Sequence, residues 1–130
     1  MSKEIVYTKN APEPIGPYSQ ALKINAGSIK LVYTSGQVGI NPQTGNLAEG
    51  GIKEQTRQVL ENVKAVLTEA GTKLDNVIKT TVFLKDMDQF NVMNEEYTKF
   101  FDEFKPARST VEAARLPKDA LVEIEVIAFI

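Results

Sequence analysis

The last ten residues of the chain, Leu121–Ile130, alternate in the pattern of a β-strand that buries one face. One set of alternate positions is wholly apolar and consists of Val122, Ile124, Val126, Ala128 and Ile130. The other set mixes charged and apolar side chains, namely Glu123, Glu125, Ile127 and Phe129. Because successive side chains of a strand point to opposite faces of a sheet, the apolar set predicts a face that lies under helices.

Two segments carry the pattern of amphipathic helices. Over Ile52–Ala70, the apolar side chains that fall on one helical stripe are Val59, Leu60, Val63, Val66, Leu67 and Ala70. Gly71 follows, and glycine commonly ends a helix in the left-handed conformation. A second helix is expected from Phe90, after a capping sequence at Asp86–Gln89. It should end before Pro106, because the residue that precedes a proline disfavours helical geometry.

The remaining β-rich segments predict one sheet. We expect strands over Ile5–Thr8, Ser19–Ile24, Leu31–Ile40, Val77–Leu84, Arg108–Ala113 and Leu121–Ile130, with a hairpin turn near Asn25–Ser28. No linker or repeat divides the 130 residues, so residues 1–130 are expected to form a single domain with its own core. Two helices and about six strands predict an α+β fold, a single mixed β-sheet with both helices packed on one face.

The second face of this sheet is too apolar for open water and too polar for a dry core. Two helices on one side leave it uncovered. Exposed apolar patches of this kind usually mark an interface, so we expect another copy of the chain to cover it. A loop that packs over the face within a monomer is the alternative.

Composition excludes several kinds of chemistry. The chain has no Cys and no His, which rules out thiol nucleophiles, disulfides, histidine bases and Cys/His zinc sites. No Asp-rich loop indicates a metal site built from carboxylates, so no metal is expected. A net charge of −2 without a basic cluster disfavours nucleic acid as a partner. The chain begins without the apolar core of a signal peptide and has no membrane-length apolar run, so a cytoplasmic protein is expected.

The charged side chains inside predicted strands include Arg108 and Glu123. A charge in an apolar setting is costly unless it meets a partner or a ligand. Arg108 is suited to an anionic substrate group, and Glu123 is suited to handling a proton or a water. The pattern leaves one alternative open, an interface ion pair between Arg108 and either Glu123 or Glu125.

A set of short motifs runs through almost the whole chain. The motifs are Ile15-Gly16-Pro17-Tyr18-Ser19-Gln20, Ser35-Gly36-Gln37, Gln55-Thr56-Arg57, Lys79-Thr80-Thr81-Val82-Phe83, Asn94 with Tyr97, Pro106-Ala107-Arg108-Ser109, Arg115-Leu116-Pro117 and Val122-Glu123-Ile124-Glu125. In this order and spacing the chain resembles the RidA (YjgF) family of enamine/imine deaminases, which also carries an older label of translation inhibitors. Each motif is weak alone, but the ordered set is specific.

The resemblance implies a chorismate-mutase-like subunit and a homotrimer whose sheets surround a central barrel, with clefts at the subunit boundaries. It also implies hydrolysis of 2-iminopropanoate and 2-iminobutanoate to 2-oxo acids and ammonia, without a cofactor. Such imines arise when pyridoxal-phosphate enzymes eliminate water from serine or threonine. Small 2-imino and 2-oxo carboxylates are therefore the expected ligands.

The resemblance also implies roles for individual residues. Arg108 matches the family's substrate-binding arginine, a planar cation that can bond both oxygens of a carboxylate. Glu123 matches the glutamate that positions or deprotonates the attacking water. Tyr18 matches a tyrosine of the cleft, and Gly36 matches a position whose backbone N–H faces the ligand. Further candidates for the substrate-binding site are Ser35, Asn94 and Thr110, the last of which stands where many members have Cys.

Each of these residues also has a purely structural explanation. Glu123 alone is typical of a solvated or paired strand residue, and Tyr18 of an aromatic residue packed in a turn. Gly36 is also typical of a bulge in a strand, and Asn94 of the surface of a helix. The family resemblance, rather than the residue types, favours a functional role.

Two other functions remain open at this point. A binding or regulatory module would hold a small carboxylate in the same cleft without converting it, because a fold does not fix a function. An RNA-directed translation inhibitor follows the older family label. The acidic charge balance and the absence of His disfavour this second alternative.

Overall fold

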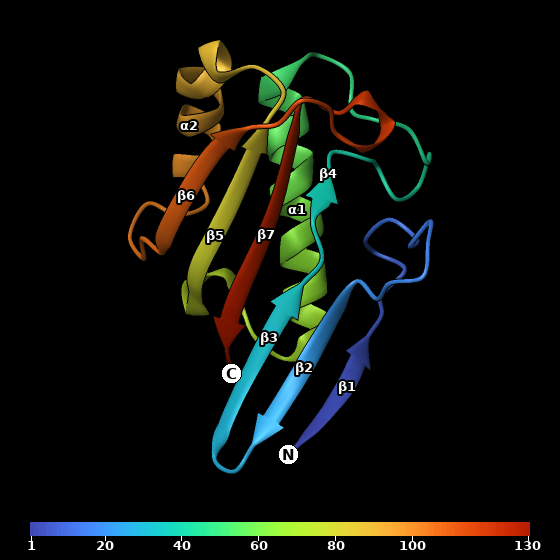
Figure 1. Cartoon of the computed structure of the whole chain (residues 1–130), viewed down its shortest axis with the longest axis vertical. Helices are drawn as coiled ribbons and strands as arrows, with labels where there is room; N and C mark the ends of the chain where they lie inside the picture. Colours follow the sequence, from blue (N-terminus) through green and yellow to red (C-terminus); the bar gives the residue numbers. More distant parts are fainter.

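One mixed β-sheet runs through the molecule, and both helices cover the same face of it (Figure 1). The computed structural model describes residues 1–130. Its strands are β1 (Ser2–Val6), β2 (Ala21–Ala26), β3 (Ile29–Thr34), β4 (Gln37–Val38), β5 (Val77–Leu84), β6 (Ala107–Glu112) and β7 (Val122–Phe129). Its helices are α1 (Ile52–Ala70) and α2 (Phe90–Thr98), with short 3-10 turns η1 (Leu74–Asn76), η2 (Met87–Gln89) and η3 (Pro117–Asp119). The expected α+β arrangement is confirmed.

The C-terminal strand β7 lies at the centre of the sheet. The strand order is β1-β2-β3-β7-β5-β6, β4 also pairs with β7, and only β5 and β6 run parallel. The apolar set of β7 is buried as predicted, since Val122, Ile124 and Ala128 have no exposed surface and Val126 is 2% exposed. Ile130 does not belong to this set, because it lies beyond the end of the strand and is 41% exposed.

Helix α1 spans the residues that its periodicity predicted. It ends at Ala70, where Gly71 adopts a left-handed φ of 90° and its N–H donates to the carbonyls of Leu67 and Thr68. The side chains that α1 buries completely in the core are Val59, Leu60, Val63, Val66 and Leu67. This apolar stripe holds the helix against the sheet.

No helix of the chain combines the length and the apolar character needed to cross a membrane.

Helix α2 is shorter than the sequence predicted. It ends at Thr98 rather than just before Pro106. At this end, backbone N–H groups donate to carbonyls three residues back, so the last turn tightens and the helix stops. Phe101 remains buried against Tyr97, with ring centroids 4.7 Å apart, whereas Phe104 is half exposed.

The boundaries of β1 and β2 differ from the expected ones. Strand β2 covers Ala21–Ala26 rather than Ser19–Ile24, because it forms a hairpin with β3 that continues until Ala26 faces Ile29. Gly27, with a φ of 64°, provides the tight turn between them. Strand β1 pairs along β2 and therefore covers Ser2–Val6 instead of Ile5–Thr8.

The strand expected over Leu31–Ile40 is two strands in the structure. β3 ends at Thr34, and the short β4 begins at Gln37. Both pair with β7, so Ser35 and Gly36 form a break along one side of the central strand. The structural alternative for Gly36, a bulge in the strand, agrees with this interruption between β3 and β4.

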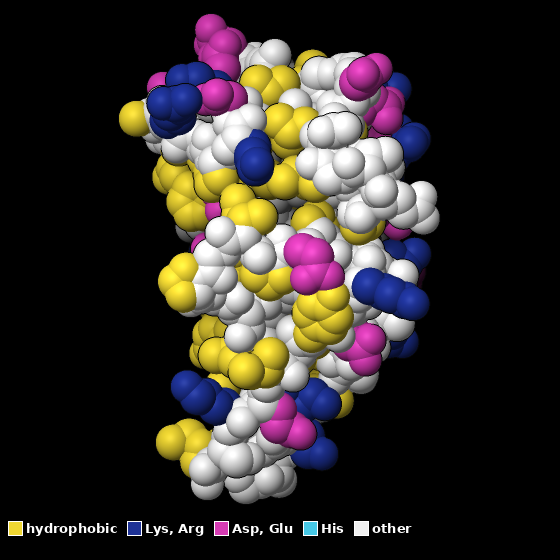
Figure 2. All heavy atoms as spheres, turned by 90° about the vertical axis from the view of Figure 1, so that its right-hand side faces the viewer, with side chains coloured by type: hydrophobic (Ala, Val, Ile, Leu, Met, Phe, Trp, Pro, Cys, Tyr) yellow, Lys and Arg dark blue, Asp and Glu magenta, His cyan; other side chains and the backbone are white.

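The face of the sheet opposite the helices stays open in the single chain. Tyr33 and Phe129 are 45% exposed and Val111 is 44% exposed, so no loop covers them. Hydrophobic side chains also run down the left margin of Figure 2, which corresponds to the front of Figure 1. The monomer alternative is therefore wrong, and the covering of this face by another copy stays a prediction.

Candidate functional site

The candidate residues lie around two separate cavities. The first, called here the Glu123 cavity, has a volume of about 330 Å³ and is lined by 13 residues that include Tyr18, Ser35, Gly36, Lys118 and Glu123. The second, called the Arg108 cavity, has a volume of about 400 Å³ and is lined by Asn94, Tyr97, Thr98, Phe101, Lys105, Pro106 and Arg108. All of the expected site residues except Thr110 thus fall into two groups.

Glu123 is half-buried on the open face of β7. Burial raises the pKa of its carboxyl group, and the nearby negative charge of Glu125 raises that pKa further. A carboxylate with a raised pKa is a better proton acceptor than an ordinary Glu side chain. The position of Glu123 in a cavity gives this acceptor access to a water or a small molecule.

Gly36 leaves the space that the carboxylate of Glu123 occupies. A Cβ atom added to Gly36 would lie 2.1 Å from Oε2 and 2.8 Å from Cδ of Glu123. Any larger residue would therefore displace that carboxylate or the backbone. The missing side chain of Gly36 serves the packing of Glu123, which is a more specific reason than the close approach of a ligand.

Tyr18 and Ser35 form part of the wall of the Glu123 cavity. The Tyr18 hydroxyl accepts a hydrogen bond from the backbone N–H of Ile15 at 3.3 Å, and its side chain is about half exposed. The Ser35 hydroxyl donates to the carbonyl of Ser19 at 2.5 Å. Ser35 therefore ties the loop before β2 to the break between β3 and β4.

Arg108 lies on β6 without a carboxylate partner. Its Nη1 donates to Oδ1 of Asn94 at 2.8 Å, and its guanidinium lies 4.7 Å from the ring centroid of Tyr97 and 5.4 Å from that of Phe90. None of the four ion pairs of the chain includes it. Within one chain Arg108 forms no ion pair with Glu123 or Glu125, and the alternative of such a pair across an interface stays a prediction.

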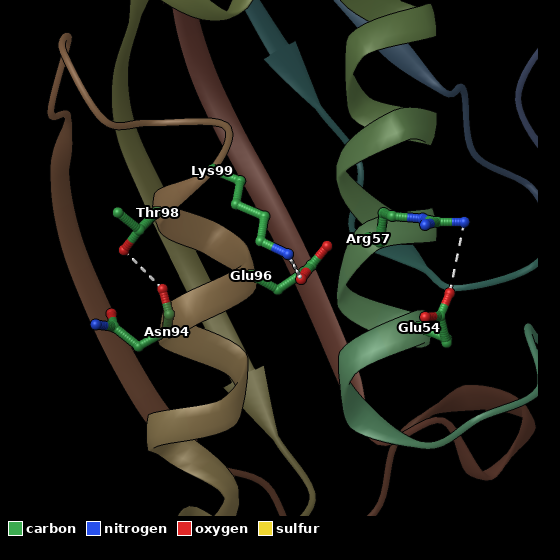
Figure 3. Close-up of polar contacts among 6 residues, drawn as sticks. All are labelled: Glu54, Arg57, Asn94, Glu96, Thr98 and Lys99. Atoms are coloured by element: carbon green, nitrogen blue, oxygen red, sulfur yellow. Dashed lines mark hydrogen bonds and ion pairs between the residues drawn. The ribbon is translucent and has the colours of Figure 1, made fainter.

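Asn94 and Tyr97 hold the guanidinium of Arg108 in place. Figure 3 shows Asn94 on the side of α2 away from the Glu96–Lys99 pair, and its amide oxygen accepts the bond from Arg108. Asn94 therefore faces Arg108 on the sheet side of α2 rather than bulk solvent. The hydroxyl of Tyr97 shares a hydrogen bond of 2.8 Å with Thr80, and burial raises the pKa of Tyr97, so its ring carries no charge beside the cation.

Thr110 borders neither cavity. Its hydroxyl oxygen is buried and has no hydrogen-bond partner in the chain. The side chain lies two residues after Arg108 on the same strand, and therefore on the same face of the sheet.

The single chain does not bring Arg108 and Glu123 together. Arg108 is aligned with Thr80, which is aligned with Val126, and these belong to the buried helix-side face. Glu123 is aligned with Phe83 and lies on the other face. Because alternate strand positions face opposite ways, the two charged side chains are on opposite sides of the sheet.

Sequence reasoning missed part of the Glu123 cavity. Its wall includes Pro12 and Ile15 from the proline-rich loop, and Lys118 from η3. Lys118 has a left-handed φ of 60°, which is uncommon for a residue with a side chain. The Pro12–Pro17 cluster was the available signal, since it predicts an irregular segment.

Nowhere in the chain do three or more Asp and Glu side chains gather as a metal site would require.

Comparisons with known proteins decide the family. A family model described as endoribonuclease L-PSP matches residues 8–130. A 2-iminobutanoate/2-iminopropanoate deaminase of Salmonella typhimurium is 50% identical over 131 residues, covering 98% of each chain. A Yersinia pestis structure described as a conserved Rid family protein of unknown function has a TM-score of 0.93 and 51% identity, covering 99% of this chain and 100% of that one. The chain belongs to the RidA family.

Other RidA relatives define how far this assignment reaches. Escherichia coli TdcF with bound serine has a TM-score of 0.88 and 45% identity, with 98% of each chain covered. Several further relatives are named only as RutC family proteins. The comparisons therefore establish the family and the fold, two helices on an open mixed sheet.

The contact between Gly36 and Glu123 gives a first prediction. Gly36→Ala should turn the Glu123 side chain to a different rotamer, because the new methyl group takes the place of the carboxylate. A crystal structure of the variant checks this. Gly16→Ala is the control, since its Cβ would meet only Tyr18 at an ordinary 3.4 Å. An unmoved Glu123 in the Gly36→Ala structure would contradict the prediction.

Proposed function

We propose that this RidA protein is a cofactor-independent hydrolytic deaminase of 2-imino acids. The proposed substrates are 2-iminopropanoate and 2-iminobutanoate with their enamine forms, and the products are 2-oxo acids and ammonia. The observation that supports this most directly is Arg108, a cation without a carboxylate partner that Asn94 orients at the edge of a cavity. The Salmonella relative with this activity in its name adds support at 50% identity.

The residues fit each step of the proposed reaction. The guanidinium of Arg108 would bind the substrate carboxylate and hold the adjacent C=N carbon in place. Glu123 would accept a proton from a water whose oxygen bonds to that carbon, while the π electrons move to nitrogen. The nitrogen takes up the proton that Glu123 accepted and then the proton of the new hydroxyl group, so the C–N bond breaks and ammonia leaves as the C=O bond forms. Glu123 can return the proton, so the enzyme ends unchanged.

Such a site needs two copies of the chain. Arg108 and Glu123 lie on opposite faces of one sheet, so the Arg108 cavity of one copy would meet the Glu123 cavity of its neighbour. The exposed apolar side chains on the open face favour such an assembly. We propose the homotrimer that the family resemblance implies, with the sites at the subunit boundaries.

The other site residues take supporting roles in this proposal. Tyr18 would form a wall of the cleft, and Gly36 would leave room for the Glu123 carboxylate and present its N–H to the ligand. Ser35 and Asn94 would hold the wall and the guanidinium, respectively. The hydroxyl of Thr110 has no partner but is buried in the single chain, so it would contact a ligand or the neighbouring copy only if the atoms that cover it moved.

A binding module without turnover is the second candidate function. It is favoured by one observation, the serine bound to the related TdcF, which shows that this relative holds a small amino acid. RNA cleavage, which the name of the family model suggests, has less support here. The chain has a net charge of −2 and no His that would act as a base.

The role of Arg108 is tested by substitution. In an assay that couples the protein to threonine dehydratase and traps remaining imine with semicarbazide, Arg108→Ala should lower kcat/KM by about 100-fold, because the substrate loses a charge-assisted bond. Arg57→Ala is the matched control, since Arg57 is exposed on α1 and pairs only with Glu54 (Figure 3). Full activity of Arg108→Ala would refute its role. Wild-type protein that binds 2-oxobutanoate without clearing imine would favour the binding module.

The two-copy site is tested with mixed oligomers. Arg108→Ala and Glu123→Gln should each have about 1% of wild-type activity or less as pure proteins. When the two are co-expressed in equal amounts, random assembly should restore roughly a quarter of wild-type activity, because about one boundary in four then pairs an intact Arg108 with an intact Glu123. Separately purified, unmixed oligomers are the control. A mixture that stays inactive, although hybrid oligomers are detected, would contradict the two-copy site.

The raised pKa of Glu123 predicts a pH dependence. The reaction needs the ionised carboxylate, so the rate should fall as pH drops through a pKa that lies above the usual value for Glu. Glu125→Gln removes the charge that contributes to this shift, so the acidic limb of the rate profile should move to lower pH. Initial rates from pH 4 to 8 check this. Glu95→Gln, an exposed change on α2, should leave the limb in place, and an unmoved limb in Glu125→Gln would contradict the assignment.

A further inference from the structure

The segment Thr8–Ile15, called here the wall segment, borders the Glu123 cavity without regular structure. Pro12, Glu13 and Ile15 line the cavity from this segment. Its two prolines have no N–H, and residues 9–15 take part in no backbone–backbone hydrogen bond. A segment of this kind needs other groups to fix its position.

The side chain of Gln20 supplies the missing hydrogen bonds. Its Oε1 accepts from the N–H of Thr8 at 2.7 Å. Its Nε2 donates to the carbonyls of Thr8 at 2.9 Å, Pro12 at 2.9 Å and, more weakly, Ala11 at 3.4 Å. Gln20 is 1% exposed, so this buried amide joins three residues of the wall segment at one point.

The backbone of Gln20 is fixed from the other side of the cavity. Its carbonyl accepts from the N–H of Ser35 at 2.9 Å, next to the Gly36 that packs against Glu123. Gln20 itself also lines the cavity. One residue therefore links the wall segment to the strand break that faces the proposed base.

Two further contacts of the wall segment do not replace Gln20. Tyr7 donates from its hydroxyl to the Glu13 carboxylate, and the N–H of Ile15 donates to the Tyr18 hydroxyl, but both bonds are exposed. An exposed bond competes with water and holds a loop weakly. The buried amide of Gln20 is the main constraint on this wall.

We propose that Gln20 is a positioning residue for imine hydrolysis, which fixes the wall segment so that the cavity keeps the shape that binds the substrate. This inference rests on the proposed function. Gln20 acts through the wall segment, and the catalytic groups are held elsewhere, Glu123 on β7 and Arg108 on β6. Its loss should therefore weaken ligand binding more than it slows the chemical step.

The test compares Gln20→Met with Gln43→Met. Met has a similar length to Gln but cannot form the hydrogen bonds, and Gln43 is exposed and outside the cavity lining. Gln20→Met should raise KM for the imine and Kd for 2-oxobutanoate by about 10-fold, with kcat changed by less than about 3-fold. Gln43→Met should match the wild-type protein. A merely structural role would lower the amount of folded enzyme, and hence apparent kcat, without this rise in KM.

If Gln20→Met does not fold, a measurement on the wild-type protein tests the positioning role of Gln20. Hydrogen exchange of the Thr8 amide should slow on addition of 2-oxobutanoate, because the bound ligand would stabilise the wall segment in the position that Gln20 holds. Active enzyme in which this exchange is unaffected, or folded Gln20→Met with wild-type KM, would overturn the positioning role alone. An inactive wild-type protein that does not bind 2-oxobutanoate would overturn the proposed function together with it.

Discussion

The alternation of the central strand β7 governs the rest of the structure. Its buried positions carry the core beneath α1, and its open positions carry Glu123 beside a cavity. The same backbone therefore supports the fold and presents the carboxylate. A shift of one residue in its pairing would exchange these two faces, so the core fixes the register of the proposed base as firmly as it fixes the fold.

Glu123 and Arg108 each have neighbours that are uncharged or unable to form an ion pair with them. Burial next to Gly36 raises the pKa of Glu123, and the only charge that contributes to this shift, Glu125, has the same sign. Arg108 contacts an amide and two aromatic rings. Neither group has its charge neutralised within the chain. A partly buried charge without an ion-pair partner costs stability, and such charges are often found at functional sites.

Local patterns predicted α1 and β7 well, and non-local contacts account for several of the differences elsewhere. The apolar stripe of α1 and the alternation of β7 depend on neighbours in sequence, and both were predicted closely. The packing of Glu123 against Gly36 joins residues that are far apart along the chain. The separation of Arg108 from Glu123 depends on the parallel pairing of β5 with β6, whose register no local pattern reveals. Gln20 escaped notice because its role lies in bonds to backbone atoms, which any sequence possesses.

The placement of Arg108 and Glu123 on opposite sides of one sheet has a consequence for regulation. If the reaction uses both, a folded but isolated subunit is chemically silent. Dilution would then switch the protein off without unfolding it, and the reversal would need no refolding. The concentration of the protein in the cell would then control turnover, because it sets the fraction of subunits that are assembled. This control would be independent of the stability of the subunit.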